Sequence, residues 1–337
     1  MARPCSVYFV PGDALKNRSL ALVIAFAAAL ASPVCPAQTY PTKVVRGIVP
    51  SAPSGSIDIV GRLVAQKLTE SMGHAFIVEN RAGAAGTIGV TSVAKAPPDG
   101  YTLLIASQSG VSAAPSLIRN LPYDPLRDLT PVALMVIQPS VLVVHPSLPV
   151  RTTKDFIALA KSKPDTLTYG SSGVGATQHL SAELFGMMTG TNLRHIPYKG
   201  GALAMTDLLG GQIYFMFSPI PTATPFLNAN KMRAIAITSL HRIEAIPDVP
   251  TLNESGVRGY DFSSWIGLLG PANLPRTIVT KLHGETTKAI ADPVLRKKLL
   301  DLGLEIRGGT PEQFAAFIKQ DIATTAKIIK AAKVQPE

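Results

Sequence analysis

Residues 43–72 read KVVRGIVPSAPSGSIDIVGRLVAQKLTESM and carry the clearest structural signal in the chain. The apolar run from Lys43 to Val49 predicts a short strand, and the small residues from Pro50 to Ser56 predict a loop. After the loop, apolar residues recur every three or four positions as far as Met72, and Gly73 is placed to end a helix. The stretch is therefore predicted to form a strand, a small-residue loop and a helix in succession.

The same unit recurs further along the chain. Tyr101 to Ala106 predicts a strand that ends at the polar residues 107–110, and Leu167 to Gly170 predicts another that ends at the loop 171–175. A helix with one apolar face is predicted from Ala176 to Met188. Strands that alternate with helices of these lengths are typical of parallel sheets built by right-handed crossovers, so an α/β fold is expected.

Length and composition indicate two such domains. The chain has 337 residues, of which 46% are hydrophobic and 16% charged, and this is a globular composition. A chain of this length exceeds one small core and suits two α/β domains of ordinary size. No repeat or linker marks a boundary, and Val144-His145-Pro146 and Ser263-Ser264-Trp265 are the candidate places where the chain crosses between domains.

The first 37 residues are predicted to be a secretory signal peptide. Lys16 and Arg18 precede an apolar run from Leu20 to Ala31, and Cys35-Pro36-Ala37 offers a cleavage site between small residues. The run is shorter than the roughly 20 residues that span a bilayer. Cleavage after Ala37 would remove both cysteines and would lower the formal net charge of +10 by 2, to +8. We therefore expect a periplasmic protein without a disulfide or a thiolate metal site.

The loops that follow the strands are the candidate ligand site, because ligands of open parallel sheets bind beyond the carboxyl ends of the strands. A helix start presents unpaired N–H groups and a partial positive charge, and glycine, serine and threonine allow close approach and add donors. The loops 50–58, 106–110 and 171–178 share this composition and could together hold a carboxylate without an arginine. Tight turns alone would explain one such loop, but recurrence in three loops favours binding.

Other sequence features narrow the class of partner. A basic surface favours anionic ligands, but the basic residues are scattered and not interleaved with aromatic residues, so nucleic-acid binding is not expected. The chain carries no Gly-x-Ser-x-Gly elbow, no Walker A lysine loop and no His-Glu-x-x-His. Gly83-x-x-Gly86-x-x-Gly89 lacks the first spacing of the dinucleotide fingerprint. We therefore expect a binding protein and not an enzyme, with no cofactor and no metal.

Several polar side chains near the loops have both structural and functional interpretations. Asp58 falls in the first turn of a helix, where it is expected to tie down loop N–H groups and where a catalytic role is the alternative. His179 and Glu183 lie four apart on one predicted helix, which suits a hydrogen-bonded pair, whereas a metal site would need a third ligand. Tyr198 could line a cleft or pack against its neighbours.

Ordered segments along the chain resemble a known family. They include Gly55-Ser-Ile-Asp58, Ala96-Pro-Pro-Asp-Gly-Tyr-Thr-Leu103, Leu121-Pro-Tyr-Asp-Pro125, Tyr169-Gly-Ser-Ser-Gly173, Ile196-Pro-Tyr-Lys-Gly-Gly201 and Pro247-Asp-Val-Pro-Thr251. With these segments, which run from about Tyr40 to the C-terminus, the sequence resembles the Bug-type receptors. These are the substrate-binding proteins of tripartite tricarboxylate transporters.

The resemblance implies a two-domain periplasmic binding protein of type II, a Venus flytrap in which each domain is a mainly parallel sheet flanked by helices. Domain 1 would comprise residues 38–143 and 266–337, and domain 2 residues 144–265. The family holds a carboxylate through main-chain groups, hydroxyls and bridging waters from the first loops of both domains. The residues expected to bind ligand are Ser54, Gly55, Ser56, Ser171, Ser172, Ala176 and Thr177 from the family pattern and Ser107, Gln108 and Tyr198 from the loops above, with Asp58 as support of the first loop.

The resemblance also implies a function. The protein would capture a small carboxylate, such as a di- or tricarboxylate or an aromatic acid, and deliver it as a monomer to the membrane permease subunits of a tripartite tricarboxylate-type transporter. The alternatives are a receptor that presents solute to a membrane sensor kinase and an α/β enzyme. The chain departs from the usual family pattern at Ser54, Ile57 and Ser218, where Gly, Thr and Asp are common, so the identity of the ligand is left open.

Overall fold

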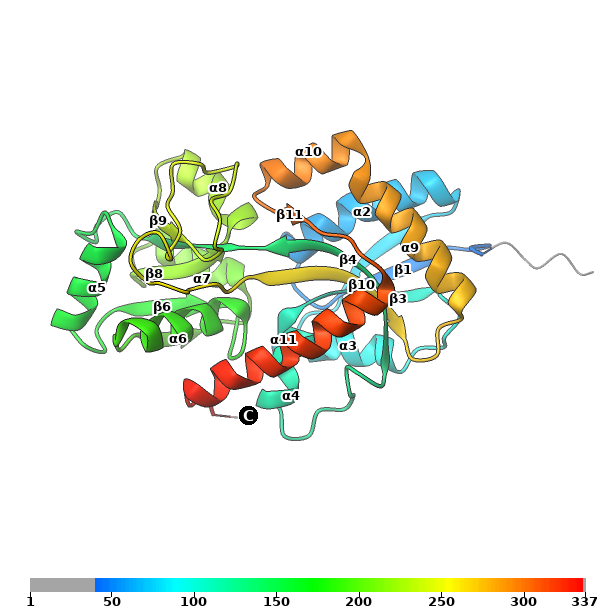
Figure 1. Cartoon of the computed structure of the whole chain (residues 1–337), viewed down its shortest axis with the longest axis horizontal. Coiled ribbons are helices and arrows are strands. Elements are labelled where there is room, and N and C mark those ends of the chain that lie inside the picture. Colours follow the sequence, from blue (N-terminus) through cyan, green and yellow to red (C-terminus); the bar gives the residue numbers. More distant parts are fainter. Residues whose placement is uncertain (1–39, 336–337) are drawn as a thin grey trace, which may run out of the picture. The chain divides into compact units, whose positions relative to one another are not determined.

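The computed structural model describes residues 40–335, and the predicted signal peptide with both cysteines lies outside the described residues. The described chain forms two β-sheets, each flanked by helices (Figure 1). We call the first sheet with its helices the first lobe and the second sheet with its helices the second lobe. Within residues 40–335, no helix is both long enough and apolar enough to cross a membrane.

The first sheet has six strands and is mixed. Across the sheet they are β11 (Glu305–Ile306), β4 (Leu129–Gln138), β10 (Ser264–Pro271), β3 (Thr102–Ser107), β1 (Val45–Val49) and β2 (Phe76–Asn80). β1 pairs in parallel with β2 and β3, whereas β10 runs antiparallel to β3 and β4, and β11 antiparallel to β4. Parallel pairing is therefore confined to the three strands of the predicted strand–loop–helix units.

Helices pack on the first sheet through apolar side chains. α2 (Ser56–Met72) follows β1 and packs beside α9 (Arg276–Ala291), which leads into α10 (Pro293–Asp301). α3 (Thr87–Ala94) and α11 (Pro311–Ala331) contribute Val90, Val93, Phe314 and Ile318 to a core around Trp265. The indole of Trp265 is fully buried and lies edge-on to Phe314, with 5.4 Å between the ring centroids. Trp265 is therefore a packing residue of the first-lobe core.

The second sheet has five strands and is also mixed. Across the sheet they are β7 (Arg194–Pro197), β6 (Thr168–Ser171), β8 (Phe215–Pro219), β5 (Ser140–Val144) and β9 (Arg233–Ile237). β6 runs parallel to β7 and β8, whereas β5 runs antiparallel to β8 and β9. Alternate side chains of β5 enter opposite cores, because successive residues of a strand face opposite sides of the sheet.

Those two cores are covered by different pairs of helices. Leu142 and Val144 pack in a core with residues of α5 (Thr153–Ser162) and α6 (Thr177–Thr189). Val141 and Val143 pack in a core with residues of α7 (Gly201–Leu209) and α8 (Ile220–Asn228). The second sheet is therefore buried on both faces, as expected where strand–loop–helix units are wound around a sheet.

The predicted two-sheet α/β class is confirmed, but the proportion of parallel pairing is smaller than expected. β4, β5 and β10 are antiparallel to their neighbours, and these strands carry the chain between the lobes. β4 ends at Gln138 and β5 begins at Ser140, so the chain enters the second sheet without an intervening helix. Because only parallel neighbours need a crossover helix, these connecting strands are free to pair antiparallel. β4 and β10 were not predicted as strands.

The C-terminal helix α11 contributes to the cores of both lobes. Phe314 and Ile318, near its start, belong to the first-lobe core around Trp265. Ile328 and Ile329, near its end, belong to the second-lobe core that also contains Leu180 of α6. Contacts between α11 and α6 follow from this placement (Figure 1).

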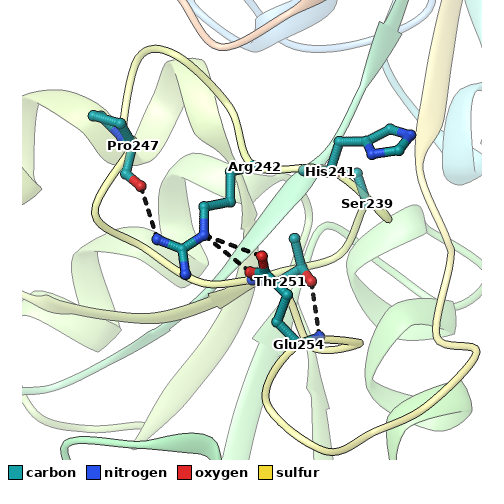
Figure 2. A network of polar contacts seen from close by, with 6 residues as sticks. All are labelled: Ser239, His241, Arg242, Pro247, Thr251 and Glu254. Atoms are coloured by element: carbon teal, nitrogen blue, oxygen red, sulfur yellow. Dashed lines mark hydrogen bonds and ion pairs between the residues drawn. The ribbon is translucent and has the colours of Figure 1, made fainter.

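The loop 239–254, which leads from β9 towards β10, is braced by a ring of polar contacts (Figure 2). Arg242 donates from Nε to Glu254 at 3.0 Å and from Nη1 to the carbonyl of Pro247 at 3.2 Å. Glu254 also accepts the N–H of Thr251 at 2.8 Å, and the Thr251 hydroxyl accepts the N–H of Glu254 at 3.0 Å. These contacts fix the shape of the segment that returns the chain to the first sheet.

Candidate functional site

A single carboxylate organises the loop between β1 and α2. Asp58, in the first turn of α2, accepts the Ser54 N–H at 3.0 Å and the Asn80 side-chain amide at 2.9 Å. Arg62, one turn later, donates to the same carboxylate at 3.1 Å and 2.9 Å. Ser54 needs this support because its φ of 64° lies in the left-handed region, which costs a residue with a Cβ about 1–2 kcal/mol.

Replacing Asp58 with asparagine is expected to lower the free energy of unfolding by about 1–3 kcal/mol, because an amide cannot accept from all of these donors. Burial raises the pKa of Asp58, but the hydrogen bonds from Arg62, Ser54 and Asn80 outweigh it and hold the pKa below its ordinary value. The stabilisation is therefore fully present above the pKa of the unfolded chain, near 4, and is lost as the pH falls further.

Urea denaturation at pH 7 and at pH 3 measures this effect, and the difference between Asp58→Asn and the unmodified protein should shrink at pH 3. Asp301→Asn is the matched control, because Asp301 is exposed and pairs with Lys297 on the surface of α10. Such a surface pair contributes at most about 1 kcal/mol. Equal losses in the two variants at pH 7 would contradict the role assigned to Asp58.

Ser56 begins the helix that follows β1, and Ser107 ends β3, the strand beside β1 in the first sheet. Ser56 is the first residue of α2, and its hydroxyl accepts a hydrogen bond from Gln138 at 2.7 Å. Ser107 ends β3, and its hydroxyl lies 3.4 Å from that of Ser109. Gln138 was missed by sequence reasoning, because it ends an apolar strand and only the fold brings it to a residue 82 positions earlier.

The two serines after β6 form hydrogen bonds within their own lobe. Ser171 is wholly buried; its hydroxyl lies 2.6 Å from Nε2 of His195 and 2.9 Å from the carbonyl oxygen of Gly173. Ser172 donates from its hydroxyl to Oε1 of Gln178 at 2.7 Å and from its N–H at 3.3 Å. Both hydroxyls therefore shape the loop.

A stacked pair of imidazoles lies behind the same loop. His179 of α6 and His195 of β7 have ring centroids 3.9 Å apart and planes within 7° of parallel. Nδ1 of His179 accepts the N–H of Gly175 at 3.0 Å. Glu183 lies 3.6 Å from Nε2 of His179 and accepts the hydroxyl of Tyr169 at 2.7 Å. Burial, together with the neighbouring His179 and against the effect of Glu183, lowers the pKa of His195 to about 3.

The predicted His179–Glu183 pair is therefore part of a polar cluster that supports a loop. Residues 40–335 contain no group of three His, Cys, Asp or Glu side chains placed to hold a metal ion. No local pattern in the sequence indicated that His195 would stack on a residue of another element.

Gln108 and Thr177 join the loops of the two lobes. Thr177 is the first residue of α6, and its hydroxyl donates to Oε1 of Gln108 at 3.3 Å. Gln108 follows β3 and is 1% exposed. The N-cap residues of α2 and α6 are Gly55 and Ala176, and neither supplies a side-chain cap. The N–H groups of both first turns consequently have no intrahelical or capping partner.

Tyr198 is placed differently from the other predicted site residues. Its N–H donates to the carbonyl of Ser171 at 3.0 Å, which holds the segment after β7 against β6. Its hydroxyl donates to Asp207 of α7 at 2.6 Å. In the described part of the chain, no hydrogen bond joins the Tyr198 side chain to Ser56 or Gln108.

A surface hollow of about 470 Å³ lies elsewhere in the second lobe, between the start of α5 and the braced loop 239–254. Arg151, Lys154 and Asp248 are among the residues that line it, and none of the predicted site residues does. Its lining mixes both signs of charge.

Comparison with known proteins places the chain in a family. The family model described as "Tripartite tricarboxylate transporter family receptor" matches residues 60–334. Protein BugT of Bordetella pertussis is 34% identical over 317 residues, which cover 93% of this chain and 97% of BugT.

Solved structures are similar to the chain over most of its length. A Rhodopseudomonas palustris protein solved with adipate is 36% identical and superposes with a TM-score of 0.85 over 88% of this chain and 100% of its own. MatC of the same species, solved with bound malate, is 31% identical with a TM-score of 0.81 over 86% of this chain and 100% of its own. This chain therefore belongs to the receptor family of tripartite tricarboxylate transporters, as the Bug-type segments of its sequence indicated.

Proposed function

We propose that this protein is a periplasmic receptor that captures a small carboxylate between its two lobes and delivers it to the permease subunits of a tripartite tricarboxylate-type transporter. The observation that carries the proposal is the hydrogen bond from Thr177 to Gln108. It sets the uncapped N-terminus of α6 against the loop that follows β3, so that donors of both lobes face a common region.

Electrostatics supports an anionic ligand at this place. Each helix N-terminus carries a partial positive charge of roughly half an elementary charge, and its unpaired N–H groups are hydrogen-bond donors. α2 and α6 both begin without a side-chain cap. The relatives solved with adipate and with malate bind dicarboxylates, which supports the same ligand class for this chain.

The proposed roles of the site residues follow from their contacts. Main-chain N–H groups of the two helix starts would bind the carboxylate, with hydroxyls of Ser56 and Thr177 beside them. Ser107 and Gln108 would line the first-lobe side, and Tyr198 would form an outer wall of the second lobe. Ser54, Gly55, Ser171, Ser172 and Ala176 are proposed to line the site. The N–H groups of Ser54, Ser172 and Ala176 donate to Asp58, Gln178 and Gly173, so these three residues would shape it.

Capture by lobe closure fits this arrangement. A ligand held by both lobes favours the closed state by the difference between its affinities for the closed and open states. The proposed domains comprise residues 38–143 with 266–337, and residues 144–265. No chemical step is part of the proposal: the protein would release its ligand unchanged to the permease.

A thermal-shift screen of the exported, processed protein tests the ligand class. The panel would contain adipate, malate, citrate and benzoate, with glucose and arginine as neutral and cationic controls. An acid present at one hundred times its Kd should add about 2.7 kcal/mol to the free energy of unfolding, and this appears as a clear rise in Tm. Shifts for glucose or arginine alone, with none for any acid, would contradict carboxylate capture.

Two bulky substitutions test the location of the site. Ser56→Phe and Thr177→Phe would each fill the proposed site from one lobe and should abolish the shift produced by the acid. Thr206→Phe is the control, because Thr206 is exposed on α7. Retention of the shift in both site variants would place the ligand elsewhere.

A further inference from the structure

The side-chain amide of Gln108 has three hydrogen-bond partners, and these partners determine its orientation. Its Oε1 accepts from Thr177 of the second lobe at 3.3 Å. Its Nε2 donates to Asp321 at 3.1 Å and faces the hydroxyl of Thr325 at 3.5 Å. An amide has one accepting and one donating end, and an ionised carboxylate can only accept, so a carboxylate beside the nitrogen turns the oxygen towards Thr177. Asp321 is that acceptor.

Stability alone does not explain why a buried carboxylate without a cationic partner occupies position 321. Its second oxygen accepts the indole N–H of Trp265 at 2.8 Å, and among the ion pairs of residues 40–335 none includes Asp321. Burial raises its pKa, and the hydrogen bonds from Ser112, Trp265 and Gln108 act in the opposite direction. A carboxylate removed from water without a cation is costly, and hydrogen bonds from neutral donors compensate only part of the cost.

The position of Asp321 along its helix adds a second, independent observation. It lies between Phe314 and Ile318, which pack in the first-lobe core, and Ile328 and Ile329, which pack in the second-lobe core. α11 is therefore anchored in both lobes (Figure 1), and Asp321 lies on the helix between the two anchoring segments.

We infer that Asp321 is a positioning residue for ligand capture: through Gln108 it aligns the hydrogen bond to Thr177, so that the C-terminal helix sets how the two lobes meet. The inference rests on the proposed function in that closure serves to hold a ligand. The contact itself involves only residues of this chain, and lobe closure is measurable without a ligand.

Asp321→Asn is the first variant. The asparagine oxygen is expected to accept from Trp265, which leaves its NH₂ group facing Gln108 and turns the Gln108 amide so that its nitrogen faces Thr177. We expect the affinity for adipate or malate, measured by calorimetry, to fall about ten-fold. We also expect the radius of gyration of the ligand-free protein, measured by small-angle X-ray scattering, to increase.

A double-mutant cycle with Thr177→Val separates positioning from a general loss of stability. If Asp321 acts through the Gln108–Thr177 contact, adding Asp321→Asn to Thr177→Val should cause no further change in affinity or radius of gyration. In the double variant Asp321→Asn with Gln108→Glu, the amide at position 321 can donate to the carboxylate at position 108, which can again accept from Thr177. This variant should restore the smaller radius of gyration. Glu285→Gln is the matched control, because it makes the same chemical change at another buried carboxylate of the first lobe.

The outcomes distinguish this inference from the proposed function. The positioning role would be overturned if the effects of Asp321→Asn and Thr177→Val on affinity and radius of gyration simply add in the double variant. It would also be overturned if Asp321→Asn behaves like Glu285→Gln. Either result would leave carboxylate capture standing. The unmodified protein could bind neither acid while the effects of Asp321→Asn and Thr177→Val on the radius of gyration are still not additive. In that case the positioning role stands and capture of these acids fails. If Asp321→Asn does not fold, Gln108→Glu alone tests the contact from the other side, because it sets two carboxylates face to face and should open the lobes.

Discussion

Gly175→Ala is expected to weaken carboxylate binding by about ten-fold or more, because the two lobes approach each other at this residue. Gly175 lies in the loop before α6 with φ of 73°, and a Cβ at this position would overlap Cδ1 of Leu117. Leu117 ends α4 (Ala114–Leu117), which follows the first-lobe strand β3. Overpacking of this kind costs about 1–3 kcal/mol, and 1.4 kcal/mol corresponds to ten-fold in affinity.

Gly190→Ala is the matched control for this prediction. Gly190 caps the other end of α6 with φ of 65°, and a Cβ there would meet no atom within 4 Å. The two variants share the cost of a left-handed alanine, about 1–2 kcal/mol, so urea denaturation should show at least this loss in each and a larger loss in Gly175→Ala. Calorimetry with the best acid of the thermal-shift screen should show a loss of affinity in Gly175→Ala alone. If Gly175→Ala and Gly190→Ala bind the acid with equal affinity, close contact of the lobes at Gly175 is not required for ligand binding.

Acidification from pH 6.5 towards pH 4 is expected to destabilise the protein by up to about 1.4 kcal/mol per pH unit, and His195 is the expected cause. Its pKa falls from 6.5 to about 3 in the folded protein. Between these values the unfolded chain binds a proton that the folded protein does not, so stability rises with pH. The contribution is fully present above about pH 6.5 and is lost progressively as the pH falls to about 3.

Between pH 7 and pH 5, the contribution of His195 to the pH dependence of stability can be measured separately from the contributions of carboxylates. The titratable groups that face His195 are His179, Glu183 and Tyr169. The pKa of Glu183 is lowered: burial alone would raise it, but hydrogen bonds from His179 and Tyr169 prevail, so Glu183 contributes only below about pH 4.5. Urea denaturation of His195→Asn, which removes the titratable ring, should show a flatter pH dependence in this range.

His241→Asn is the control for the pH experiment, because His241 is exposed and its carbonyl, not its ring, accepts from Ser239 (Figure 2). This variant should keep the slope of the unmodified protein. An unchanged slope in His195→Asn would show that another group binds the proton on unfolding, and the stacked imidazoles would then lose their assigned role in acid sensitivity.

The local elements of this fold were predictable from short stretches of sequence. The strand at 45–49, the loop after it and the helix to Met72 follow from apolar periodicity and from a terminal glycine, Gly73, with φ of 69°. Such patterns act over one or two turns, and their hydrogen bonds are formed between near neighbours. The loops proposed to bind ligand were delimited from the sequence in the same way, and their ligand contacts stay a prediction.

The pairing of strands β4 and β10 was not predictable in this way. Both strands are apolar and connect the lobes, and antiparallel pairing of their backbones depends on which strands lie beside them. A run of apolar residues in a buried strand carries no periodicity that reveals its direction.

The residues that support the site come from the tertiary structure. Ser56 meets Gln138 across 82 positions, Thr177 meets Gln108 across 69, and Gln108 meets Asp321 across 213. The sequence was sufficient for the family, the strand–loop–helix units and the helix ends, because hydrogen bonding and apolar periodicity are local. The order of strands and the course of α11 across both lobes determine which distant polar groups meet, and no local pattern encodes that order.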